Sequence, residues 1–197
     1  MTFNNTSDHI DPYRIPSEEN NPFLIGADVI TYLTGVRHPM IMVDRVINYY
    51  SKPLTIIAER YVSANEPAFV GHFPNLKLWP GIYTVEGLRQ SCNILNILSN
   101  LEKVGLLKGV IELHNRQTLR PQIDHDLCQR VLDYLKNVKL NDPDLFTVRI
   151  KLLEPVFAGS LITYHCSRKK NDPNCFSVKA AVDDRLIAKG EVIQNFN

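Results

Sequence analysis

Two ionisable side chains, fourteen residues apart, lie on either side of a helix start and together have the groups needed for acid–base chemistry. His72 lies in a segment rich in glycine and proline, and Glu86 lies in the apolar-patterned run that follows it. Between them, Pro80 and Gly81 are residue types that favour the start of a helix. The first N–H groups of a helix have no partner within the helix, so an anion or a carbonyl oxygen binds there readily.

This combination predicts elimination of a hydroxyl group next to a carbonyl. The helix N–H groups would polarise the carbonyl, a neutral His72 would remove the α-proton, and a protonated Glu86 would give its proton to the departing hydroxyl. A glutamic acid that stays protonated near neutral pH needs an apolar pocket. The same residues also allow a purely structural interpretation, in which His72 is a core histidine in a turn and Glu86 is a helix-surface residue paired with Arg89.

The long helix that must carry Glu86 is predicted from residue 81 to about residue 103. Apolar residues recur there at helical spacing, and their broad coverage indicates a helix wrapped by other structure. One polar stripe remains on this helix, formed by Glu86, Arg89, Gln90, Asn93 and Asn96.

The flanking segments predict mostly strands. A short helix is expected over residues 27–33, and a second amphipathic helix over residues 121–139, whereas residues 104–120 fit no clear pattern. Alternating or β-branched runs predict strands at residues 41–49, 54–62, 148–152, 161–166, 176–182 and 186–192. This order predicts an α+β fold in which one antiparallel sheet curls around the long helix.

Composition restricts the classes of function. The chain has 197 residues, which suits a single domain over residues 23–197 preceded by a polar, flexible arm over residues 1–22. A net charge of +1 gives no reason to expect nucleic-acid binding. There is no apolar run of membrane-spanning length and no apolar signal-peptide core, so we expect a cytoplasmic protein. The four cysteines have no short paired spacing, so neither a disulfide framework nor a metal site is expected.

Three ordered sequence blocks resemble the FabZ-type 3-hydroxyacyl-[acyl-carrier-protein] dehydratases. They are residues 38–46 (HPMIMVDRV), 65–74 (NEPAFVGHFP) and 78–90 (LWPGIYTVEGLRQ). The blocks stand in family order and at family spacing, including the interval from His72 to Glu86. A looser match follows at residues 154–160 (EPVFAGS). The related FabA branch normally has Asp where this chain has Glu86.

The resemblance implies a hot-dog fold, with a helical insertion at about residues 104–145. It implies His72 as catalytic base, Glu86 as catalytic acid, and Gly81 as the backbone donor to the thioester carbonyl. Phe73, Pro80 and Gln90 are the further residues expected at the substrate. The substrate would be a 3-hydroxyacyl chain on the phosphopantetheine of acyl carrier protein, in fatty-acid or polyketide-type biosynthesis. No metal and no other cofactor are expected. Dimers are implied in which the His of one subunit faces the Glu of the other, with higher oligomers as an option.

Departures from the family pattern keep alternatives open. Arg89 replaces a small residue and favours ionisation of the neighbouring Glu86, which works against Glu86 as a proton donor. This suggests a heterodimer with a related hot-dog subunit, a non-catalytic partner subunit, or a hot-dog thioesterase in which Glu86 activates water. Trp79 replaces a slimmer residue, so it packs in the core or narrows the acyl tunnel. The helix at 121–139, with Arg116, Arg120 and Arg130 nearby, could cover the tunnel mouth, dock an acidic carrier protein, or pack on the sheet.

Overall fold

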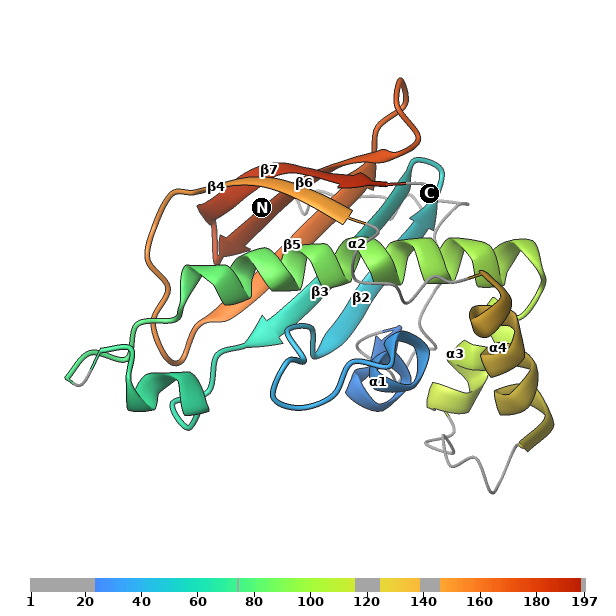
Figure 1. Cartoon of the computed structure of the whole chain (residues 1–197), viewed down its shortest axis with the longest axis horizontal. Coiled ribbons are helices and arrows are strands. Elements are labelled where there is room, and N and C mark those ends of the chain that lie inside the picture. The colour runs from blue at the N-terminus through green and yellow to red at the C-terminus, as the bar shows by residue number, and fades with distance from the viewer. Residues whose placement is uncertain (1–23, 74, 116–124, 139–145, 196–197) are drawn as a thin grey trace, which may run out of the picture.

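The long helix predicted around Glu86 is present and is the longest element of the protein. The structure is a computed structural model that describes residues 24–73, 75–115, 125–138 and 146–195. The long helix, α2, spans Gly81–Lys103 and lies across one face of the sheet (Figure 1). The other elements are β1 (Ile25–Gly26), α1 (Ala27–Thr34), β2 (Arg45–Ser51), β3 (Leu54–Tyr61), the 3-10 helix η1 (Pro67–Val70), α3 (Leu107–Asn115), α4 (His125–Val138), β4 (Phe146–Leu152), β5 (Leu161–Arg168), β6 (Cys175–Val182) and β7 (Arg185–Gln194).

The seven strands of the described residues form one antiparallel sheet in the order β1-β2-β3-β5-β6-β7-β4. The first strand after the helices, β4, therefore lies at an edge beside β7, the last strand of the chain. Side chains alternate between the two faces of a strand. On the inner face, fully buried residues such as Ile56, Tyr164 and Phe176 form the core together with Leu88 and Leu95 of α2. This arrangement confirms the predicted α+β hot-dog architecture.

The polar stripe predicted on α2 is largely buried. Gln90, Asn93 and Asn96 are all less than a tenth exposed. The side chain of Asn96 donates to Gln194 Oε1 at 2.9 Å and accepts from Arg168 Nη2 at 2.5 Å. Burying an amide is unfavourable unless it is hydrogen-bonded, and here the end of β7 and the end of β5 supply its partners.

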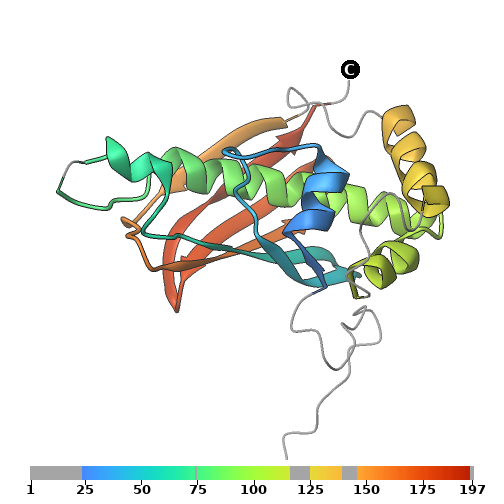
Figure 2. The same ribbon diagram turned by 90° about the horizontal axis from the view of Figure 1, so that it is seen from below.

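Three shorter helices gather toward the C-terminal part of α2 (Figures 1 and 2). The helix predicted at residues 121–139 is present as α4, and its predicted first residues lie outside the described part of the chain. Val131 and Leu135 on α4 are buried, and the Tyr32 hydroxyl of α1 donates to the Cys128 carbonyl. These contacts show α4 packed against α1 and not the expected packing on the sheet, and its expected roles at the tunnel mouth and at a carrier protein stay predictions.

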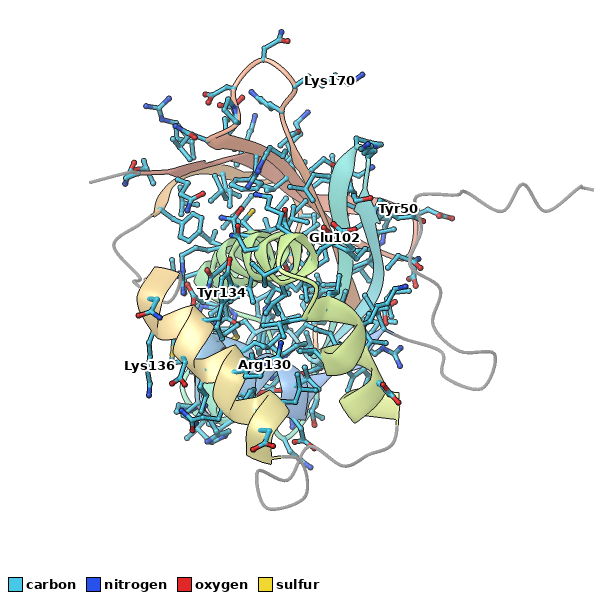
Figure 3. The ribbon with its side chains drawn as sticks, turned by 90° about the vertical axis from the view of Figure 1, so that its right-hand side faces the viewer. Tyr50, Glu102, Arg130, Tyr134, Lys136 and Lys170 are labelled. Carbon is cyan, nitrogen blue, oxygen red and sulfur yellow. The ribbon has the colours of Figure 1, made fainter. Side chains whose placement is uncertain are left out.

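The segment at residues 104–120, which fits no clear pattern in the sequence, contains α3. Figure 3 looks toward the C-terminal end of α2 and shows α3 and α4 beside each other in front of it. The arm predicted at residues 1–22 and two arginines of interest, Arg116 and Arg120, lie outside the described residues. Across the described part of the chain, helices fall short of the length and apolarity that crossing a membrane requires.

One glycine allows the edge strand β4 to lie against β7. Gly190 is opposite Ile150, and a Cβ atom built on Gly190 would lie 2.0 Å from the Arg149 carbonyl oxygen. We therefore expect Gly190→Ala to lower the free energy of unfolding by about 1–3 kcal/mol, because backbone atoms would have to move. Urea denaturation measures this change.

Gly71→Ala is the matched control for that experiment, because a Cβ atom there meets nothing within 4 Å. Its stability should stay unchanged or rise slightly, since alanine restricts the unfolded chain. Equal stability of both variants would contradict the close approach of β4 and β7.

Candidate active site

The loop before α2 fixes the ring of His72. The residues at 67–70 form the 3-10 helix η1, and the chain then turns through Gly71 to His72. Nδ1 of His72 lies 2.8 Å from the carbonyl oxygen of Leu78. A carbonyl oxygen only accepts hydrogen bonds, so Nδ1 carries the hydrogen, and in the neutral ring Nε2 has the free lone pair. Nε2 is therefore the atom of His72 that can take a proton.

The start of α2 lies beside this ring. Pro80 is the N-cap residue in an extended conformation, and Gly81 is the first helical residue. Tyr83 N–H donates to the Pro80 carbonyl at 2.9 Å, and within the described residues the N–H of Gly81 has no such acceptor. A free N–H at a helix N-terminus is a favourable donor to a polarised oxygen.

His72 and the helix start share one cavity of about 260 Å³. Leu152 and Leu153 at the end of β4 form another part of its wall, and Leu152 approaches the position where Gly81 lacks a Cβ atom. The cavity is lined by His72, Leu78, Trp79, Gly81, Thr84, Leu152, Leu153, Glu154, Pro155, Val156 and Ile187. A general base and a backbone donor thus face the same space.

Glu86 lies one and a half turns further along α2, in a tight polar cluster. Arg89 donates from Nε to Glu86 Oε2 at 2.8 Å and from Nη2 to Glu86 Oε1 at 2.7 Å. These two parallel bonds are the bidentate geometry in which Arg binds carboxylates most strongly. The hydrogen bonds to Glu86 raise the pKa of Arg89 although its partial burial opposes this. The two parallel bonds therefore hold the Glu86 carboxylate in a fixed orientation.

Gln90 connects this cluster to the first sequence block. Its Nε2 donates to Glu86 Oε1 at 2.8 Å and to the Met40 carbonyl at 2.7 Å, and its Oε1 accepts from Met42 N–H at 2.9 Å. Gln90 is only 3% exposed. Its side chain bonds directly to Glu86, and its expected place at the substrate stays a prediction.

Glu86 faces a second cavity, of about 460 Å³. Apart from Glu86 and Arg89, the wall of this cavity is mostly apolar. It is lined by Met40, Ile82, Tyr83, Val85, Glu86, Arg89, Val148 and Ile150. Within the described part of one chain, His72 and Glu86 therefore line two separate cavities on either side of the start of α2. The inner face of β4 contributes to both.

The remaining predicted residues separate into two groups. Trp79 is 3% exposed, packs edge-on against Phe69 and Tyr83, and also lines the His72 cavity. Trp79 thus packs in the core and also lines this cavity, and its role in narrowing an acyl tunnel stays a prediction. Phe73, by contrast, is 52% exposed, with its ring centroid 4.6 Å from that of His72.

A supporting ion cluster was missed by the sequence reasoning. Arg60 on β3 donates to Asp44 Oδ1 at 2.5 Å and to Glu66 Oε1 at 2.6 Å, and its guanidinium lies over the Trp79 ring. Asp44 and Glu66 belong to the first and second sequence blocks, so this cluster ties the two blocks together beside Trp79. The sequence did contain a signal for this cluster. Asp44 is an acidic residue in a mostly apolar block, and Glu66 is an acidic residue in a turn-forming block.

Comparisons with known proteins point to one family. The FabA-like domain model matches residues 35–127. The chain is 34% identical over 106 residues to the 3-hydroxyacyl-[acyl-carrier-protein] dehydratase FabZ of Chlamydia pneumoniae, covering 52% of this chain and 69% of that protein. For the FabZ of Thermotoga neapolitana, identity is 34% over 94 residues, covering 48% and 66%. A solved structure, the dehydratase heterocomplex ApeI:P from Xenorhabdus doucetiae, aligns at 13% identity over 85% of this chain and 91% of its own, with a TM-score of 0.47.

The hydrogen bonds of Gln90 generate a testable prediction. Gln90→Ala removes the partner of the buried Met42 N–H and one donor to Glu86. A buried N–H without a partner costs about 1–3 kcal/mol, so we expect a loss of that size in the free energy of unfolding. Thermal or urea denaturation measures it.

Gln129→Ala serves as the control, because among the described residues the side chain of Gln129 bonds to Asp133 alone, on the exposed face of α4. Its effect should stay within about 0.5 kcal/mol. If Gln90→Ala were as mild as this control, Gln90 would not hold the first block against α2.

Proposed function

Because the chain belongs to the family of FabZ-type 3-hydroxyacyl-[acyl-carrier-protein] dehydratases, we propose that it removes water from a 3-hydroxyacyl thioester on acyl carrier protein. The product is the trans-2-enoyl thioester, and the setting is fatty-acid or polyketide-type biosynthesis. The observation that carries this proposal is the shared cavity of His72 and the N-terminus of α2. It supplies a base with a defined free nitrogen and a donor for the thioester carbonyl.

In this mechanism the Gly81 N–H donates to the thioester carbonyl, which makes the α-proton more acidic. His72 Nε2 takes that proton while Nδ1 keeps its bond to the Leu78 carbonyl. A carboxylic acid then protonates the 3-hydroxyl group, which leaves as water. The C–O bond breaks as the double bond forms, so atoms and charge balance with no external oxidant or reductant.

We propose that the acid comes from a second hot-dog subunit. Two observations support this arrangement. First, His72 and Glu86 line different cavities of the described chain. Second, large apolar side chains are exposed around the same helix start, where Val70 is 87% exposed and Ile82 is 65% exposed. A second subunit covering these side chains would bring its own Glu86 toward His72, and the apolar wall beside Glu86 would then face the acyl chain.

Complementation between two inactive variants tests this shared site. His72→Ala and Glu86→Gln should each lower turnover by about 10²–10⁴-fold, because each removes one acid–base group. When the two variants are unfolded and refolded together, mixed dimers contain one site with both groups intact. We expect roughly a quarter of wild-type activity to return. Mass spectrometry of a 3-hydroxyacyl carrier protein reports the loss of water.

If mixing restores nothing while mixed dimers are present, both groups act within one chain and the shared site is wrong. If neither single variant affects turnover, His72 and Glu86 are not the acid–base pair. The same experiment shows whether the chain alone is active or requires a related subunit, because the wild-type homodimer is its reference.

The Arg89–Glu86 pair supports a second candidate function. A guanidinium that binds a carboxylate through two bonds stabilises its charged form, which can accept a proton from water but has none to donate. That chemistry would make the chain a hot-dog thioesterase. It would equally suit a subunit that supplies His72 to a site shared with a partner subunit, where the partner's carboxyl group is not paired with an arginine. Product analysis separates these options, since a thioesterase releases a free acid and a dehydratase an enoyl thioester.

Arg89→Ala distinguishes the two roles of Glu86 by the direction of its effect. An adjacent guanidinium favours the charged form of a carboxyl group, and Arg89→Ala removes it. If Glu86 is the acid of a dehydratase, turnover at neutral pH should rise. If Glu86 is the base of a thioesterase, turnover should fall. Arg89→Lys, which retains the charge, is the control and should leave turnover near its wild-type value.

A further inference from the structure

The outer face of the sheet contains a row of three cationic lysines that ends on a histidine, and the catalytic proposal does not use it. Lys151 on β4 is opposite Lys189 on β7, Lys189 is opposite Lys179 on β6, and Lys179 is opposite His165 on β5. Directly opposed residues of an antiparallel sheet point to the same face. These four side chains, called here the cationic row, therefore cross four adjacent strands in one line.

The cationic row lies in a groove on the face away from α2. The groove has a volume of about 770 Å³, and all four row residues line it together with Arg149. The neighbouring residues in sequence, such as Ala180 and Ala188, alternate with the row and are buried in the core on the side of the sheet that faces α2. The three lysines are exposed, so their charges are available to a partner.

Charges in this groove are poorly neutralised within the described part of the chain. Glu191 is the acidic residue of the groove, and it is already bonded to Lys169. No ion pair involves Lys151, Lys179 or Lys189 among the described residues. Burial and the charge of Lys179 lower the pKa of His165. Like charges directly opposite each other destabilise a sheet, so the row reduces stability unless an anionic partner is bound.

We propose that the cationic row docks an acidic α-helix of the acyl carrier protein. Adjacent strands are about 4.8 Å apart, so the four positions extend over about 14 Å. Carboxylates on successive turns of one helix face are about 5.4 Å apart, which matches this interval closely. Beyond His165 the next residue in line is Ile57, so the row ends after four positions. This short length suits a protein helix of about three turns.

The position of the row relative to the candidate site supports this occupant. On β4, Lys151 belongs to the row and the next residue, Leu152, lines the His72 cavity. On β7, Leu186 lines the groove and Ile187 lines the His72 cavity. A carrier protein docked here would hold its phosphopantetheine beside the exposed end of β4, where Leu153 also lines that cavity. The inference rests on the proposed dehydratase function for the identity of the partner.

Lys189→Glu tests the proposal most directly, because Lys189 lies directly opposite a lysine on each of its two neighbouring strands. The substitution turns two repulsive pairs into attractive ones, so the thermal midpoint should rise. The same change should weaken binding of purified carrier protein by about tenfold or more, because one attractive contact becomes repulsive. Lys189→Gln should lie between wild type and Lys189→Glu in both measurements. Lys170→Glu is the matched control: Lys170 lies on the loop between β5 and β6, outside the row (Figure 3), and its effect on binding should stay within about twofold.

Titration with fluorescently labelled carrier protein measures binding, and turnover of a carrier-bound and of a small N-acetylcysteamine thioester is measured separately. If the row docks the carrier protein, the Lys189 variants lose more turnover with the carrier-bound substrate than with the small thioester. If Lys189→Glu and Lys170→Glu bind the carrier protein equally, the docking proposal is overturned, even where wild type dehydrates both substrates. Tighter binding of a DNA duplex than of carrier protein would also overturn it. Carrier binding that depends on the row, in a protein that dehydrates neither substrate, would support docking and refute the dehydratase function.

Discussion

Burial of the long helix is the constraint on which the arrangement of the site depends. Because α2 is covered on most of its surface, each polar group on it needs a partner inside the protein. Gln90 finds its partners in the backbone of Met40 and Met42, and Asn96 finds them in Gln194 and Arg168. These bonds fix the rotation of the helix about its axis. Glu86 lies on the same helix and therefore takes its direction from them.

The edge strand β4 contributes to all three parts of the surface to which we propose functions. Its inner face lines the His72 cavity at one end and the Glu86 cavity further along, and its outer face contributes Lys151 to the cationic row. This strand follows the helical insertion in sequence but pairs with the last strand of the chain. The His72 cavity, the Glu86 cavity and the cationic row therefore all depend on stable pairing of β4 with β7. That pairing requires the close approach at Gly190.

The sequence predicted the long helix, most strands and the hot-dog architecture, because their apolar periodicity and turn residues are local signals. It did not predict α3, whose pattern is short, or the burial of Gln90 and Asn96, whose partners are distant in the chain. Arg89 beside Glu86 was foreseeable from their spacing of three residues, but the bidentate geometry was not. The ion cluster of Arg60 and the cationic row depend on strand register, which only the folded chain defines.

The partner of His72 Nδ1 is a backbone carbonyl, where many catalytic histidines have a carboxylate. Nδ1 donates the same hydrogen bond whether the ring is neutral or positively charged, because the carbonyl of Leu78 only accepts. The imidazole can therefore take up and release a proton at Nε2 without turning. In the proposed dehydration, a ring that keeps one orientation in both protonation states would need no resetting step between turnovers.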